Sequence, residues 1–415
     1  MIRSKTAIMT SAVWFGAMAL AITFWQTGSR ADQPDQLAPV PDFSSTERSA
    51  FQRAAVNGTL GDDAPQLLPK AAKYYVNRLT QAEYQQPHAE GSPLPTMDQL
   101  VQEAVTQIIV PPSVDQPLND NQQAFQDEYA KYLLVELQNV LKNPKAIARV
   151  NAARILARLG RAGVSRATDL MVTSIDPKNQ QLEAVKFWCF RGLKDLLIYG
   201  KPKEDQRNHI VTALMDYITA PHKPPQHPLP GEVDAIHYVR REAVRALAQW
   251  HIPADDNGKM PAALVLMRVM AADGLTPPPS LTERVAAAEG LCRMQSRKYD
   301  RYQPEYAARQ VGYFVADFLV AYNDDLSRNP HSEAWKILAA KLNLALTDLG
   351  NDTKHRDKYI NAVIEQCSNM LKQVKEGGPI DPSQLVSWLQ GHAPPEAQSL
   401  YKDDPTSVVK TKGAE

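Results

Sequence analysis

The segment VNAARILARLGRAG, residues 150–163, decides the fold of this chain. Counted from Ala148, its apolar residues recur at offsets 4, 7, 8 and 11. At about 100° per residue these positions fall within an arc of about 100°, the width of a helix stripe that faces a core. The stripe residues are Ala148, Ala152, Ile155, Leu156 and Leu159. The spacing therefore predicts an amphipathic helix with Arg154, Arg158 and Arg161 on the opposite side.

The same template recurs three more times along the chain. Leucine holds offset 8 in every copy, and a small residue (Ala or Cys) holds offset 4. The further copies read Val185, Cys189, Gly192, Leu193, Leu196; then Val239, Ala243, Ala246, Leu247, Trp250; then Glu283, Ala287, Gly290, Leu291, Met294. Glu283 is the one charged residue in these stripes, and a weaker fifth copy begins at Trp335.

Each clear copy is followed by a break and then by a second amphipathic segment, so that helix pairs repeat. The copies begin 37, 54 and 44 residues apart. The second helices are expected at 166–175, 204–218, 260–272 and 305–322. One such pair cannot bury its own apolar face, but stacked pairs can, and this repeat length is typical of α-solenoids.

Two copies, ARVNAARILARLG and YVRREAVRALAQW, resemble the first helix of HEAT repeats, whose pattern is roughly Val-Arg-x-x-Ala-x-x-x-Leu. The resemblance covers residues 144–350 and extends more weakly over 96–376. It implies an all-α fold, a right-handed α-solenoid of HEAT-like helix pairs. It also implies that the second helix of each pair lines the concave surface. The residues expected on or near that side are Asp169, Thr173, Arg207, Asp216, Arg268 and Asp317.

A basic residue follows the first stripe position in every clear copy. In HEAT repeats this base commonly makes a structural contact between repeats, so the resemblance implies a stabilising role here. With the offset-8 leucines, the structural repeat positions are Arg149, Leu156, Lys186, Leu193, Arg240, Leu247, Arg284 and Leu291.

The arginines of the opening segment have two interpretations. They form the solvated face of a repeat helix, or a patch for an anionic partner, because residues 145–166 carry six bases and no acid. The whole chain has 46 basic and 46 acidic residues and no net charge. A dedicated nucleic-acid binder has a basic excess, so the solvated face is favoured and no nucleic-acid partner is expected.

The first 31 residues predict export. Arg3 and Lys5 precede an uncharged run, residues 7–25, that spans about 28 Å as a helix, close to the thickness of a bilayer core. Basic residues before such a run keep the N-terminus inside. Ser29-Arg30-Ala31 fits cleavage after Ala31, whereas the length of the run fits an uncleaved anchor. Both versions place the rest of the chain outside the cytoplasm, in the periplasm or cell envelope, with membrane contact through 7–25 if uncleaved.

The longest repeat spacing contains PHKPPQHPLP, residues 221–230, which predicts an insertion in an extended, proline-rich conformation. Insertions in solenoids often emerge on the binding face. We therefore expect a protein partner to contact this segment and the neighbouring second helices. The candidate partner-binding residues are His222, Lys223, Pro224, Pro225, His227, Arg268 and Asp317.

No nucleotide-binding, zinc-protease or serine-hydrolase motif occurs in the sequence. The spacing of His222, His227, His237 and His251 fits no zinc motif, and PADDNGK (253–259) fails the EF-hand pattern and favours a turn. The three isolated cysteines favour buried apolar roles. No catalytic residue, metal or cofactor is predicted. An enzyme of HEAT-like fold with carboxylates in a concave pocket stays open as the alternative, beside a structural subunit of an envelope assembly.

The sequence thus predicts five parts. These are a signal peptide or anchor (1–31), an extended tether (32–43), N-terminal helices that are degenerate repeats or a cap (44–142), the HEAT-like array (143–376), and a short C-terminal helix with a disordered tail (377–415). Tyrosines and phenylalanines between 302 and 322 form one aromatic helix, either core or partner-binding. Together these features predict an exported helical-repeat scaffold for protein–protein interactions at the cell envelope.

Overall fold

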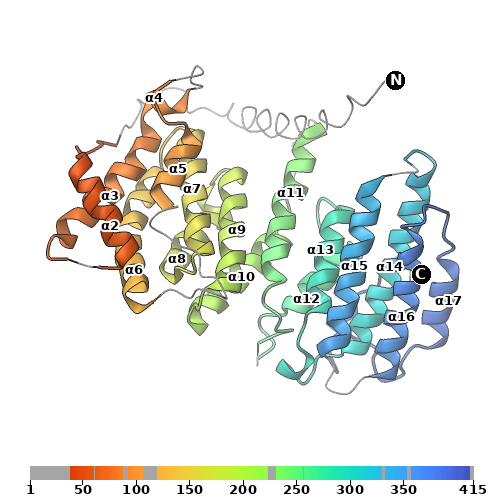
Figure 1. The fold of residues 1–415 in the computed structure, drawn as a ribbon. Helices are drawn as coiled ribbons and strands as arrows, with labels where there is room; N and C mark the ends of the chain where they lie inside the picture. Colours follow the sequence, from red (N-terminus) through yellow and green to blue (C-terminus); the bar gives the residue numbers. More distant parts are fainter. Residues whose placement is uncertain are drawn as a thin grey trace, which may run out of the picture. The chain divides into compact units, whose positions relative to one another are not determined.

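The computed structural model describes residues 38–59, 61–86, 92–105, 119–222, 230–255, 257–329, 332–352 and 357–411. Helix accounts for 71% of the structure, and these ranges contain no strand beyond an isolated bridge between Tyr302 and Tyr401. The prediction of an all-α fold is confirmed (Figure 1). The apolar run 7–25 and the tether up to residue 37 lie outside the described ranges.

The described residues form two compact units, which divide within α10 and α11. The first unit contains α2 (Ser45–Asn57), α3 (Ala64–Asn77), α4 (Ala82–Gln85), α5 (Met97–Val105), α6 (Asp120–Val140), α7 (Ala146–Arg161), α8 (Thr168–Ile175) and α9 (Glu183–Tyr199). Helices α10 (Glu204–Thr219) and α11 (Pro230–Leu247) contribute to both units. The second unit contains α12 (Ala262–Ala271), α13 (Leu281–Cys292), α14 (Pro304–Leu326), α15 (Glu333–Asp352), α16 (Lys358–Gln373) and α17 (Ser383–Gly391).

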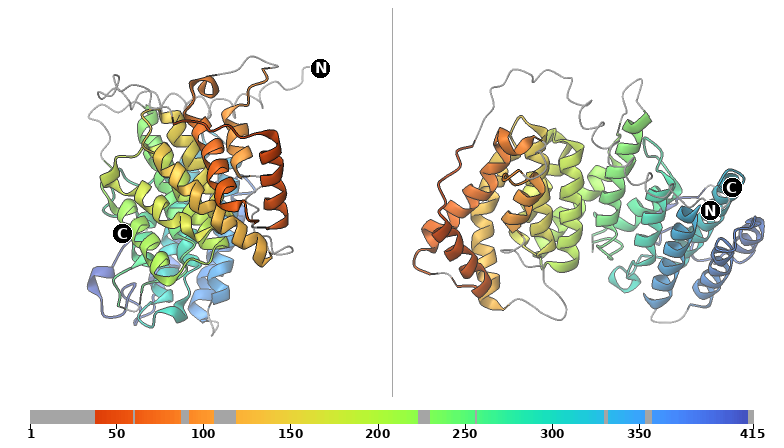
Figure 2. Two further views of the ribbon diagram at one scale, coloured as in Figure 1. Left: turned by 90° about the vertical axis from the view of Figure 1, so that its left-hand side faces the viewer. Right: turned by 45° about the horizontal axis from the view of Figure 1, so that its top comes forward.

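Helices in the first unit pack against near neighbours in the sequence. Helix α7 packs against α9 and α5, and α8 closes against α9. Towards the N-terminus, α3 packs against α6 and α5, and α2 lies on α6 (Figure 2). The predicted second helices occur as α8, α10, α12 and α14, close to their expected bounds.

Helices in the second unit follow a regular order. Helix α13 packs against α15, while α14 packs against α12, α16 and α17. Helix α13 contacts α14, and α15 contacts α16, so that each predicted first helix lies against the second helix of its own pair (Figure 1). The first helix of a pair therefore contacts the next first helix, and the second helix contacts the next second helix.

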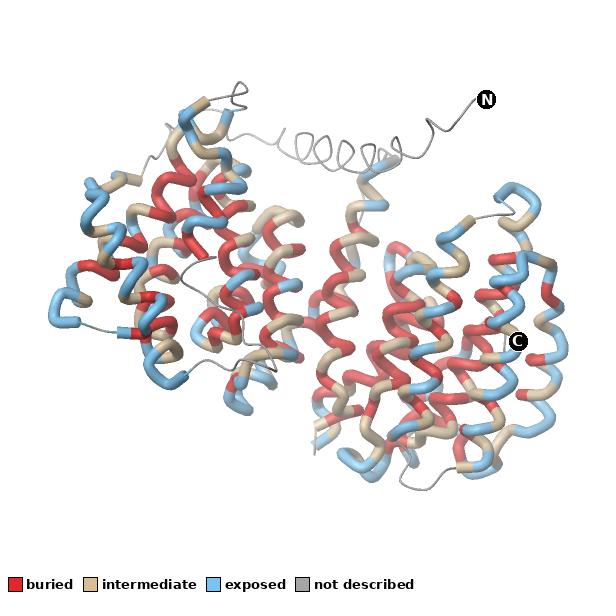
Figure 3. Tube along the Cα trace, viewed as in Figure 1, coloured by how far each residue is buried: buried red, intermediate tan, exposed pale blue. Residues whose placement is uncertain are grey.

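The stripe positions form the core that the sequence predicts. Every stripe residue of the four clear copies is buried, and the offset-8 residues Leu156, Leu193, Leu247 and Leu291 are at most 1% exposed. Burying a leucine side chain contributes about 1.5–3 kcal/mol. Figure 3 shows the buried residues along the helix faces that meet neighbouring helices, with exposed residues on the opposite faces.

Glycine lets α7 and α9 cross at close range. A Cβ atom on Gly160 would lie 2.7 Å from the carbonyl carbon of Gly192, and backbone atoms cannot move aside as a flexible side chain can. Gly290 occupies the same template offset as Gly192, and a Cβ there would lie 2.8 Å from the Cβ of Ala248. The small residues of the template thus set the spacing between helices.

The C-terminal tail is ordered as far as residue 411, and the prediction of a disordered tail is wrong there. Leu400, Tyr401, Val409 and Thr411 are buried. The hydroxyl of Tyr306 in α14 donates to the carbonyl of Val409 (2.7 Å) and accepts from its N–H (3.0 Å). The order of the tail could not be predicted, because its hydrogen-bond partners lie about a hundred residues away in the sequence and produce no local periodic pattern.

Replacing Gly160 by alanine should lower the free energy of unfolding by about 1–3 kcal/mol, because the added methyl overlaps the backbone of Gly192. This loss should exceed the gain of about 1 kcal/mol in helix propensity. Denaturant unfolding followed by circular dichroism measures the change.

Gly231→Ala is the matched control, because nothing lies within 4 Å of a Cβ at that exposed position of α11. It should leave the unfolding midpoint unchanged or raise it slightly. Equal midpoints for Gly160→Ala and Gly231→Ala would contradict the close crossing of α7 and α9.

Candidate functional site

The base of the proline-rich insertion is fixed in the second unit. The backbone N–H of His222 donates to the carbonyl of Thr276 (2.9 Å), and its ring Nε2 lies 2.9 Å from the carbonyl oxygen of Tyr217. The His222 ring also packs against the Tyr217 ring, with 4.7 Å between centroids. Of the predicted binding residues in this segment, Lys223, Pro224, Pro225 and His227 lie outside the described residues.

Arg240, the basic residue of the third repeat copy, forms a fully buried ion pair. Arg240 Nε donates to Glu283 Oε1 at 2.6 Å, and both side chains have no exposed area. Arg240 also donates to the carbonyl of Pro277, and Glu283 Oε2 accepts from the N–H of Ser280 at the start of α13. Glu283, the charged residue in the apolar stripe of the fourth copy, is thus the partner of Arg240, the basic residue of the third copy.

Arg284, the basic residue of the fourth copy, links α13 to α12 and α14. Arg284 donates through Nε to the carbonyl of Met270 (2.6 Å) and through Nη2 to Asp317 Oδ2 (2.8 Å). Its guanidinium also lies 4.8 Å from the ring centroid of Phe314. Lys186 pairs with Glu183 on its own helix, and Arg149 is half-buried.

The two predicted partner-binding residues outside the insertion differ in their surroundings. Asp317 is held in the ion pair with Arg284, and both side chains are 15% exposed. Arg268 is half-buried near the end of α12, where its carbonyl accepts the N–H of Asp273. The other residues expected on the concave side are exposed: Asp169, Thr173, Arg207 and Asp216.

The aromatic helix α14 is core. Tyr306, Phe314 and Phe318 are at most 1% exposed, and Tyr322 is 3% exposed. The three cysteines are also buried and free, and burial raises the pKa of Cys189 and of Cys367 to about 12. The cysteines thus take the buried apolar roles that the sequence predicts, and of the two interpretations of the aromatic helix the burial favours core.

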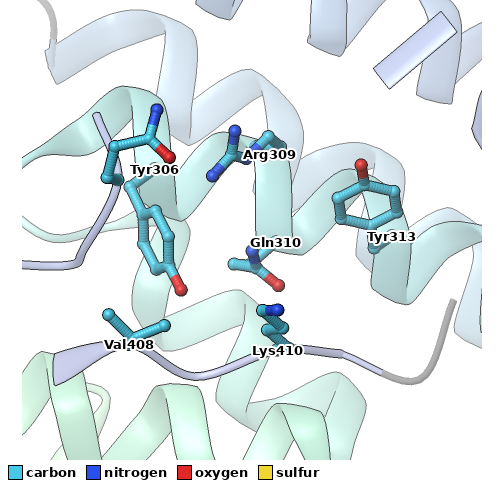
Figure 4. A pocket seen from close by; sticks show the side chains of 7 residues that line it. Tyr306, Arg309, Gln310, Tyr313, Val408 and Lys410 are labelled. Atoms are coloured by element: carbon cyan, nitrogen blue, oxygen red, sulfur yellow. The ribbon is translucent and has the colours of Figure 1, made fainter. Parts of the chain in front are cut away.

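A hollow of about 200 Å³ opens between α14 and the C-terminal segment, and we call it the α14 hollow (Figure 4). Figure 4 shows Arg309, Gln310 and Tyr313 on α14, with Val408 and Lys410 on the segment that faces them. The residues that line it are Tyr306, Arg309, Gln310, Tyr313, Gln398, Val408 and Lys410. The lining therefore combines two cations with amides and phenol rings, and it contains no carboxylate.

Hydrogen bonds between the tail and α14 hold the walls of the α14 hollow. Besides the paired bonds between Tyr306 and Val409, Gln310 Oε1 accepts from the N–H and from the hydroxyl of Thr411, each at 3.1 Å. Gln310 is 2% exposed and Thr411 is fully buried. Because these side chains are fixed, the hollow is preformed rather than dependent on a ligand for its shape.

Arg309 lies among tyrosine hydroxyls. Burial raises the pKa of Tyr306, Tyr313 and Tyr359, and the positive charge of Arg309 partly opposes each rise. The phenols are therefore neutral near pH 7, and the Tyr306 hydroxyl donates to the carbonyl of Val409. The sequence does not reveal these residues as a site, since the tyrosines belong to a helix expected to be either core or partner-binding, and Lys410 belongs to a segment expected to be disordered.

The described residues contain no cluster of histidine, cysteine or carboxylate side chains that could hold a metal ion. In the segment 253–259, the N–H of Gly258 donates to the carbonyl of Asp255, and the Asp255 carboxylate accepts from the N–H of Met260. This is the turn that the sequence predicts. The enzyme alternative requires pocket carboxylates, and Glu305, whose pKa is raised by burial, is not in the lining of the α14 hollow.

Replacing Arg240 by methionine should cost about 3–5 kcal/mol of unfolding free energy, because the carboxylate of Glu283 would stay buried without its charged partner. The double variant Arg240→Met/Glu283→Gln removes that charge and keeps an acceptor for Ser280. It should recover a large part of the loss in denaturant unfolding. A double variant no more stable than Arg240→Met would show that the ion pair is not what the arginine provides.

Acidification should destabilise the fold through His251, whose pKa is lowered by burial and then by the charge of Arg293, against an opposing effect of Asp348. A lowered folded-state pKa means that stability is complete above the ordinary histidine pKa of about 6.5 and is lost as pH falls below it. His251→Asn should remove this loss, because asparagine tolerates the positive φ of 56° at this position.

The test compares the unfolding free energies of wild type and His251→Asn from pH 8 to pH 5. Their difference should be constant above about pH 7 and should shift in favour of the variant below about pH 6.5. A difference that stays constant over the whole range would contradict the assignment.

No protein-family model matches the chain, and neither the curated proteins nor the solved structures include a significantly similar one.

Proposed function

We propose that this chain is an exported scaffold of HEAT-like repeats, arranged as a right-handed α-solenoid, that binds a protein partner at the cell envelope. The order of helix packing carries this proposal. In the second unit α13 packs on α15, and α14 packs on both α12 and α16. Layers in which each helix contacts its counterpart in the next pair are what stacked repeats require.

Two features of the repeat positions support the same proposal. The stripe residues of four copies are buried at equivalent positions. The basic residues of two copies form ion pairs with other helices: Arg240 with Glu283, and Arg284 with Asp317. Such contacts between successive helices rigidify an array, and a rigid array loses little conformational entropy when a partner binds.

The insertion 221–230 is the proposed contact with the partner. Its first residues are anchored by His222, and α11 begins at its last residue, Pro230. A proline-rich segment binds with a low entropy cost because its backbone is already restricted. Exposed residues of the second helices in the second unit, such as Asp216 in α10, would complete the surface.

Export rests on the N-terminal sequence. The described residues include no helix long and apolar enough to cross a membrane, and residues 7–25 are not among them. We propose that this run directs the chain out of the cytoplasm, either as an anchor or as a signal peptide removed after Ala31.

Replacing residues 223–229 with a Gly/Ser linker of equal length should remove a stoichiometric partner. The replacement keeps His222 and Pro230, so that α10 and α11 retain their ends. The measurement is an affinity pull-down of the tagged full chain from gently solubilised envelope, read by mass spectrometry, followed by titration of the purified companion against both chains. We expect at least a tenfold loss of affinity, about 1.4 kcal/mol.

The matched control is Gly378→Ser in the loop beyond α16, where nothing lies within 4 Å of an added Cβ, so that the change alters a loop without touching the insertion. It should retain the companion at full affinity. A companion that binds wild type and the 223–229 replacement equally would exclude the insertion as the contact, and a chain that purifies alone would contradict the scaffold.

A further inference from the structure

The α14 hollow brings two cations together from segments that are distant in the sequence. Arg309 comes from α14 and Lys410 from the C-terminal segment (Figure 4). Within the described part of the chain, neither side chain forms an ion pair, although most other buried or half-buried arginines of this unit do, as Arg284 and Arg293 show. The hollow is thus a preformed positive site with no internal counter-charge.

Arg309 is oriented for a ligand. Its guanidinium lies 5.4 Å from the ring centroid of Tyr306, which limits its movement. Its Nη2 donates to the carbonyl of Ala397 over a long distance of 3.4 Å. Its Nε is buried and has no hydrogen-bond partner among the described residues. A buried donor without a partner is costly, and a ligand that accepts from it removes that cost.

The size and lining limit what can enter. A volume of about 200 Å³ equals that of roughly six or seven water molecules at about 30 Å³ each. This space holds an acidic group on a short carbon body and is too small to enclose a nucleotide or a helix. Val408 and the rings of Tyr306 and Tyr313 offer apolar contact for that body, while Gln398 lies exposed at the rim.

We propose that the α14 hollow binds a carboxylate, with the guanidinium of Arg309 as the forked donor and Lys410 as a second positive charge. A carboxylate, like a phosphate, accepts two parallel hydrogen bonds from a guanidinium. The apolar contacts of Val408 and the tyrosine rings favour a carboxylate on a carbon body over inorganic phosphate. The site goes beyond the proposed scaffold role, because it needs neither the repeat architecture nor the insertion. The carboxylate comes from a small organic acid or from an acidic side chain of another protein.

Ligand titrations on the full chain in detergent, monitored by ligand-observed NMR, distinguish a small organic acid from an acidic protein side chain. The probes are glutarate, the blocked peptide acetyl-Ala-Glu-Ala-amide, its glutamine counterpart, and inorganic phosphate. We expect glutarate or the glutamate peptide to bind, the glutamine peptide to bind at least about tenfold more weakly, and added salt to weaken binding. Binding of glutarate alone assigns a small organic acid, and binding of the glutamate peptide assigns an acidic side chain.

Three variants test the residues. Arg309→Gln should reduce affinity about tenfold or more, and Arg309→Lys should restore only part of it, because lysine lacks the fork. Lys410→Gln should cause a smaller loss, since Lys410 is exposed and its removal leaves the core unchanged. Lys375→Gln, an exposed cation beyond the far end of α16, is the matched control and should bind as wild type.

Circular dichroism of each variant checks that the helices remain, and Lys410→Gln keeps the test valid if Arg309→Gln is unstable. The proposal is overturned if neither carboxylate probe binds, if phosphate binds more tightly than both, or if the Arg309 and Lys410 variants bind as well as Lys375→Gln.

Discussion

The buried ion pair between Arg240 and Glu283 is the interaction on which the surrounding helices depend. Two charges without any exposed area are tolerated only when their geometry and their remaining hydrogen bonds are satisfied together. Glu283 meets this condition by accepting from Arg240 with one oxygen and from the start of α13 with the other. Arg240 also donates from Nη2 to the carbonyl of Pro277. The part of α11 from Arg240 onward, the loop before α13 and the start of α13 are therefore held together by one polar cluster.

Small residues act alongside this polar constraint. Apolar stripes attract helices to one another without specifying distance, because the hydrophobic effect has no direction. Gly160 and Gly192 specify it in the first unit, since their backbones meet where any side chain would overlap. Gly290 does the same against Ala248 in the second unit. Close crossings of this kind leave room for few alternative packings, so that the repeated template determines which neighbour each helix takes as well as the burial of its apolar face.

The elements that sequence reasoning predicted are those with a local pattern. Stripes such as Ala148 to Leu159 are legible because every member lies within a few turns of one helix. The same reasoning identifies Glu283 as the one charged residue in the apolar stripes, but it does not identify its partner, because Arg240 lies 43 residues earlier. The tail was misread for the same cause: Tyr306 and Val409 are 103 residues apart, and neither residue marks the other in the sequence. The α14 hollow could not be predicted at all, because two segments must meet before it exists.

The ordered tail and the α14 hollow follow from one physical requirement. Helix α14 buries polar atoms, the hydroxyl of Tyr306 and the amide of Gln310, and such atoms need hydrogen-bond partners. The backbone of Val409 and the side chain of Thr411 supply these partners. Segment 408–410 then lies along α14 with Val409 turned inward and buried, so that its neighbours Val408 and Lys410 line the hollow. Lys410 lines the same hollow as Arg309 because the buried polar groups of α14 determine where the tail must lie.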